Sequence, residues 1–68
     1  MLTNEEKIAI VNSHKKSLCY AQYGVQINLL EENSKSSPDA LSVQLLNNQI
    51  EDYNKQIARL DAEIASLS

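Results

Sequence analysis

The chain has 68 residues and a formal net charge of -3, with six Lys and Arg side chains against nine Asp and Glu. A chain this short buries little surface by folding alone, so we expect one small domain that gains stability from oligomerisation or a partner. The excess of acidic side chains opposes attraction to phosphate backbones, so we expect no direct nucleic-acid ligand. The scarcity of turn residues leaves little room for strands, which indicates an all-α protein.

The beginning of the chain and its single cysteine bear on the compartment. The longest uninterrupted apolar run, Ile8 to Val11, is far too short to cross a membrane. Glu5 and Glu6 stand where a signal peptide would be basic. Because Cys19 is the only cysteine of the chain, an internal disulfide and a multi-cysteine zinc site are excluded. We expect a cytoplasmic or virion location, with Cys19 a half-buried helix residue unless it cross-links two copies.

The first helix is predicted over residues 4 to 33. Thr3, followed three residues later by Glu6, matches a capping box, in which each side chain accepts a backbone N–H at the start of a helix. Lys15 and Lys16 are too few for a nucleic-acid-binding stripe, and we expect them to keep the helix soluble. No strong stop signal precedes the polar residues that end this helix.

A turn over residues 34 to 37 leads to a second helix over residues 38 to 67. Ser37 would cap this helix, Pro38 would take its first position and Asp39 would add an acid to its first turn. Apolar residues recur along it at alternating spacings of three and four, the heptad pattern of a coiled-coil seam. The seam consists of Val43, Leu46, Ile50, Tyr53, Ile57, Leu60, Ile64 and Leu67.

The two predicted helices have similar lengths and a short connection, so we expect an antiparallel two-helix coiled-coil hairpin. A turn near Ser36 places Leu18 opposite Tyr53, apolar against apolar. The rival arrangement is a parallel coiled coil between two chains, which β-branched and Leu residues at alternating seam positions favour. Residues beside the seam are nearly all neutral, so charge does little to choose between the two. They are Ser42, Asn47, Gln49, Asn54, Gln56, Asp61 and Glu63.

Further apolar residues lie away from the seam. The first helix carries two apolar stripes on almost opposite sides, and the first of them consists of Val11, Leu18, Val25 and Leu29. A helix that is apolar on two sides is usually covered on both. We expect two leucines of the second helix to join the second stripe near the turn, with Gly24 permitting close approach. The alternative is that the tyrosines are half-exposed without a partner. The predicted protein interface consists of Tyr20, Tyr23, Ile27, Leu30, Leu41 and Leu45.

No group of residues indicates catalysis or metal binding. His14, the only histidine, has no carboxylate or thiol three or four residues further along the helix. Glu31 and Glu32 diverge by about 100° around a helix and cannot converge on one cation. We expect Glu31 to pair with Lys35, four residues on. Catalytic residues, cofactors and enzyme activity are therefore not expected.

Four stretches of the chain carry a resemblance. They are LTNEEKIAI at 2–10, LLEEN at 29–33, SSPD at 36–39 and IARLDAEIASL at 57–67. Together they resemble small helical-hairpin proteins of tailed phages that infect marine cyanobacteria. The resemblance implies a phage source, in the host cytoplasm or the virion, and supplies no functional residues.

These observations predict a non-enzymatic structural or assembly protein. Its hairpins would assemble into a helical bundle with copies of themselves or dock on a larger protein assembly. The alternative is a small regulatory binder, an inhibitor or chaperone that covers one target protein. Neither function requires a membrane or direct nucleic-acid partner, and the two differ in stoichiometry, because a structural subunit occurs in many copies.

Overall fold

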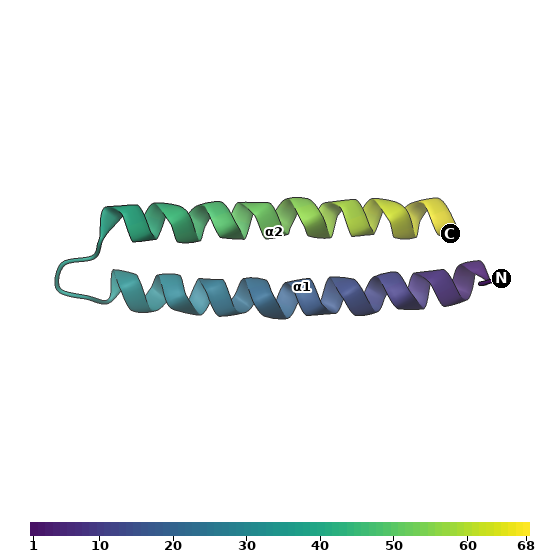
Figure 1. Cartoon of the computed structure of the whole chain (residues 1–68), viewed down its shortest axis with the longest axis horizontal. Coiled ribbons are helices and arrows are strands. Elements are labelled where there is room, and N and C mark those ends of the chain that lie inside the picture. Colours follow the sequence, from purple (N-terminus) through teal and green to yellow (C-terminus); the bar gives the residue numbers. More distant parts are fainter.

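The computed structural model describes residues 1 to 68 as two antiparallel α-helices joined by a short connection (Figure 1). α1 spans Asn4–Asn33 and α2 spans Ala40–Leu67. The molecule is a rod of 54 × 15 × 14 Å with both termini at the same end (Figure 1). Neither helix has the length and apolarity that a membrane span requires. The predicted all-α class and helical hairpin are confirmed.

α1 begins with the predicted capping box. The Thr3 hydroxyl oxygen accepts the backbone N–H of Glu6 at 3.1 Å, and the Glu6 carboxylate accepts that of Thr3 at 2.9 Å. These bonds satisfy donors that would otherwise be unpaired at the start of the helix. The bond from the Thr3 backbone also holds the pKa of Glu6 below its ordinary value.

α2 begins two residues later than predicted, because its cap is Asp39 and not Ser37. The Asp39 carboxylate accepts the Ser42 hydroxyl at 2.8 Å and the backbone N–H of Leu41 at 3.3 Å. The Ser42 bond, followed by the Leu41 bond, lowers the pKa of Asp39. A carboxylate also interacts favourably with the positive end of the helix dipole, which a hydroxyl does not. Pro38 therefore precedes the cap and does not take the first helical position.

The seam of α2 packs against α1 within the chain, and all eight of its residues are half-buried. α1 presents shielded residues at the same alternating spacing of three and four. They are Ile8, Val11, Lys15, Leu18, Gln22, Val25, Leu29 and Glu32. Each helix thus contributes a heptad seam, and the α2 seam is used inside the hairpin instead of in a parallel coiled coil between chains.

The hairpin contains no buried apolar side chain, and its one buried residue is Glu32, with 9% of its surface exposed. Two helices that touch along one line shield each seam residue from one direction only. The accessible surface is 5110 Å². A compact monomer of this mass would expose about 4,300 Å², so the hairpin exposes about 800 Å² more than a globular protein of equal size.

Candidate interaction surfaces

Two polar residues in the α1 seam are bonded directly to α2. The Lys15 Nζ lies 2.6 Å from the Asp61 carboxylate. The Gln22 side-chain amide donates to the Asn54 side-chain oxygen at 2.6 Å and to the Ile50 carbonyl at 3.2 Å. Lys15 and Gln22 are one heptad apart on α1, and so are Asp61 and Asn54 on α2. The two bonded pairs therefore form a polar ladder with a single register.

The polar ladder corrects two of our predictions. Lys15 lies in the seam and not in solvent, and its hydrogen bond to Asp61 raises its pKa. Asn54 and Asp61 were given no part in choosing the arrangement, yet they hold both polar seam residues. Sliding α2 by one heptad would leave Lys15 facing Asn54 and would separate Asp61 from its cation. Polar seam residues specify register in coiled coils for this reason. The missed signal is the spacing, because steps of three and four from Leu18 reach Lys15 and then Gln22.

Glu32 holds the connection between the helices. Its carboxylate accepts the backbone N–H of Asp39 at 2.9 Å and lies 2.6 Å from the Lys35 Nζ. The Lys35 bond, followed by the Asp39 bond, lowers the pKa of Glu32, and the same bond raises the pKa of Lys35. The predicted pair between Lys35 and Glu31 is wrong, because Glu32 occupies the last seam position of α1 and faces the connection, while Glu31 is exposed.

The six residues of the predicted interface are all exposed, from 37% for Ile27 to 68% for Tyr20. Four of them lie on α1 at spacings of three, four and three. We call these the outer stripe: Tyr20, Tyr23, Ile27 and Leu30. Lys16 extends the same spacing, and its ammonium lies 5.8 Å from the centre of the Tyr20 ring. The stripe is thus a row of large apolar side chains with a cation at one end.

The outer stripe and the two leucines of α2 form separate surfaces. Each group lies about 150° around its own helix from the seam. Because the two seams face each other, the outer stripe points away from α2, while Leu41 and Leu45 point away from α1. Both groups lie near the turn along the rod, but their directions around the two helices differ. A flat partner can therefore cover one group or the other.

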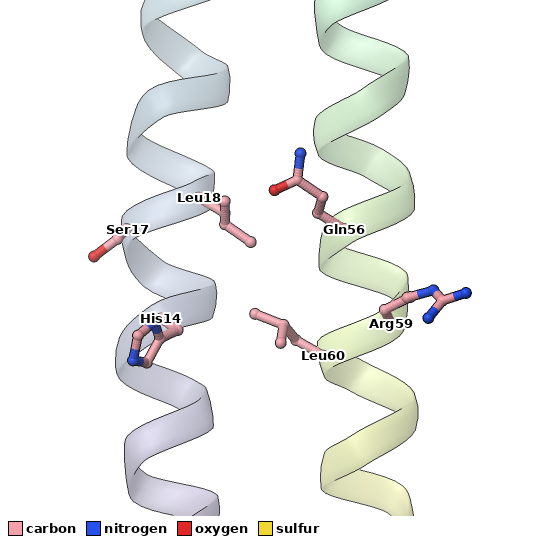
Figure 2. A pocket seen from close by; sticks show the side chains of 6 residues that line it. All are labelled: His14, Ser17, Leu18, Gln56, Arg59 and Leu60. Atoms are coloured by element: carbon pink, nitrogen blue, oxygen red, sulfur yellow. The ribbon is translucent and has the colours of Figure 1, made fainter.

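A shallow groove lies along one side of the seam, and Figure 2 shows the side chains that line its first hollow. Its first hollow has a volume of about 440 Å³ and is lined by His14, Ser17, Leu18, Gln56, Arg59 and Leu60. Its second hollow, of about 530 Å³, is lined by Leu18, Gln49, Asp52, Tyr53 and Gln56. Leu18 and Leu60 point into the space between the helices, whereas the Arg59 guanidinium extends away from α1 (Figure 2). The two hollows share Leu18 and Gln56 and are parts of one groove.

The groove and the polar ladder lie on opposite sides of the seam. In the ladder, Lys15 and Gln22 of the α1 seam are bonded to Asp61 and Asn54, which flank the α2 seam on the same side. The groove is flanked instead by His14, Gln49 and Gln56. One side of the seam is closed by polar bonds, and the other is open over apolar side chains.

Two residues with reactive side chains lie at the surface. His14 is exposed at the edge of the groove, and Cys19 is exposed and unpaired instead of half-buried as predicted. The structure brings together no three His, Cys, Asp or Glu side chains that could hold a metal ion. The groove and the outer stripe are surfaces that suit packing.

No protein-family model, no curated protein and no solved structure matches this chain.

Proposed function

We propose that the chain is a non-enzymatic structural or assembly protein, a helical hairpin that joins copies of itself or a larger protein assembly. One observation carries the proposal: no apolar side chain is buried, while nine large apolar side chains are exposed. Removing such surface from water stabilises a complex. Six of the nine side chains gather on two surfaces, the outer stripe and the pair Leu41 and Leu45, and gathered apolar surface of this kind marks interaction sites. The hairpin is an incomplete packing unit until a partner covers it.

The outer stripe is the surface proposed to dock on the assembly. Its four residues span about 15 Å of α1. Residues at spacings of three and four form the ridges by which helices pack against each other. Tyr20 and Tyr23 combine a large apolar ring with a hydroxyl that tolerates water at the rim of an interface. Gly24 borders the stripe, and a Cβ added there would meet nothing within 4 Å, which leaves room for a close backbone.

The setting of this assembly is proposed from the resemblance to small hairpin proteins of tailed phages. The resemblance supports a multi-copy component of the virion or a complex formed in the infected cell. A structural subunit in either setting is present in many copies, whereas an inhibitor or chaperone forms one defined complex with its target. Stoichiometry therefore separates the proposed role from regulatory binding.

The experiment compares charge substitutions on the two exposed surfaces. Tyr23→Glu places a charge in the outer stripe, and Leu45→Glu places one on the far side of α2. Ala9→Glu is the matched control, because Ala9 is exposed and lies two heptads before Tyr23 at the same position around α1. Sedimentation of the full chain, and its incorporation into the purified native assembly, are measured for each variant. We expect Tyr23→Glu to abolish incorporation with helix content unchanged, and Ala9→Glu to retain it.

Two outcomes would contradict the proposal. The first is that neither Tyr23→Glu nor Leu45→Glu changes oligomer size or incorporation. The second is a single one-to-one complex with one enzyme, accompanied by loss of that enzyme's activity, which would support the regulatory binder instead.

A further inference from the structure

We infer that two copies of the chain pair across the groove to form an antiparallel four-helix bundle. The inference rests on the proposed role in assembly, but it uses the groove and leaves the outer stripe free. The two sides of the seam differ in a way that selects the groove. The Lys15 and Asp61 charges on the other side already pair with each other and would be buried without gaining a partner, whereas the groove exposes Leu18, Tyr53 and Leu60 and carries two unpaired charges, Asp52 and Arg59.

The surface left exposed by the hairpin matches what a dimer requires. Its excess over a compact monomer is about 800 Å², and each partner in a standard protein interface buries about 800 Å². Seam residues that α1 and α2 only half-bury would be enclosed by four helices, as in a four-helix bundle. The groove is flanked by Gln49 and Gln56, which are neutral and can exchange hydrogen bonds across an interface.

The order of side chains along the groove fits a two-fold axis. Leu18 and Gln56 line both hollows and therefore lie at the middle of the groove. A two-fold axis that crosses the helices at this point places the first hollow of one copy opposite the second hollow of the other. Gln56 then meets the partner's Gln56, and a glutamine amide can both donate to and accept from its twin.

Charge complementarity follows from the same axis. Arg59 lines the first hollow and Asp52 lines the second, one heptad apart on the same face of α2. Neither makes an ion pair within the hairpin, whose ion pairs are Lys15 with Asp61 and Lys35 with Glu32. The Arg59 guanidinium extends away from α1 (Figure 2). In the dimer each Arg59 faces the partner's Asp52, so the interface contains two opposite-charge contacts.

The test is a charge-reversal exchange on the full chain. Arg59→Asp alone sets acid against acid at both contacts, and Asp52→Arg alone sets cation against cation. We expect each to weaken dimerisation by at least about tenfold, because like charges across an interface cost several kcal/mol. An equimolar mixture of the two variants restores opposite charges at both contacts, so we expect it to dimerise as the unsubstituted chain does. Lys55→Asp, a charge reversal on the face of α2 away from the groove, is the matched control.

Sedimentation equilibrium measures the dimer, and circular dichroism shows that each variant remains helical. The inference is overturned if the unsubstituted chain is monomeric at its highest soluble concentration, if Arg59→Asp and Asp52→Arg dimerise unchanged, or if the mixture stays monomeric. One combination of results would overturn the groove dimer and leave the proposed function standing. In it, no dimer is detected, Tyr23→Glu loses incorporation into the native assembly, and Arg59→Asp retains it.

Discussion

The two seams of the hairpin differ in composition although they have the same spacing. Every seam position of α2 is apolar, whereas α1 carries Lys15, Gln22 and Glu32 among its eight. A uniformly apolar seam can pair in several registers, or with another copy of itself, at similar free energy. The polar positions of α1 add bonds that exist in one register only. The α2 seam thus supplies the apolar surface for packing, and the polar residues of the α1 seam determine the register in which the two helices pair.

The largest expected effect comes from truncating the α2 seam. Ile57→Ala removes apolar contacts from a half-buried position, so we expect it to lower the free energy of unfolding by about 1–2 kcal/mol, below the 2–5 kcal/mol typical of fully buried sites. Urea denaturation followed by circular dichroism measures the change. The exposed Ala58→Ser on the same helix is the control. If Ile57→Ala cost less than Gln22→Ala, the assignment of packing to α2 would be wrong.

Substitutions in the α1 seam should change stability less than Ile57→Ala does, but they should change how well the register between the two helices is defined. Gln22→Ala removes two hydrogen bonds and should cost about 1 kcal/mol. Gln22→Leu restores apolar contact, and we expect stability at or above that of the unsubstituted chain but a less well-defined register. Spin labels on Cys19 and on an Ala58→Cys substitution report the register as a distance distribution. A distribution that stays equally narrow in Gln22→Leu, and in Gln22→Leu combined with Lys15→Leu, would contradict a register role for the ladder.

The smallest effect is the dependence of stability on pH, since Asp39 is exposed and Lys15 is only half-buried, which leaves Glu32 as the one shielded group among the three. The pKa values of Glu32 and Asp39 are lowered in the hairpin from ordinary values of 4.5 and 3.8. Their contribution is therefore complete above those values and is lost as the pH falls through the lower pKa of the folded state. Lys15 has a raised pKa, so its contribution is complete below 10.5 and is lost as the pH rises through the folded-state pKa.

Thermal melts across this range test the sign at each end. We expect the melting temperature to fall in acid and again in strong base, with a plateau between. Glu32→Gln should lower the plateau and flatten the acid limb, because glutamine cannot ionise. An acid limb that keeps its full depth in Glu32→Gln would show that other carboxylates are responsible.

Local signals in the sequence predicted the helices well, and the reasons are visible in particular residues. Thr3 and Glu6 are three residues apart and cap α1 with no help from the rest of the fold. The start of α2 was harder to predict, because Ser37 and Asp39 are both good capping residues and Asp39 is additionally held in place by Glu32 from the end of α1. The outer stripe was visible from its spacing, but its direction relative to Leu41 and Leu45 depends on which face of each helix meets the other.

The sequence by itself determined two long helices and an apolar seam on the second, because these follow from capping residues and from spacings of three and four. The short connection favoured an antiparallel return, but the tertiary structure decided between that return and a parallel coiled coil between chains. Only the tertiary structure decided that Lys15 and Gln22 belong to the seam. Their partners are distant in the chain, and Asn54 lies 32 residues beyond Gln22. A polar residue on an apolar stripe reads as solvent-facing until the helix opposite it supplies an acceptor. The same holds for the groove, whose residues come together only when α1 and α2 lie side by side.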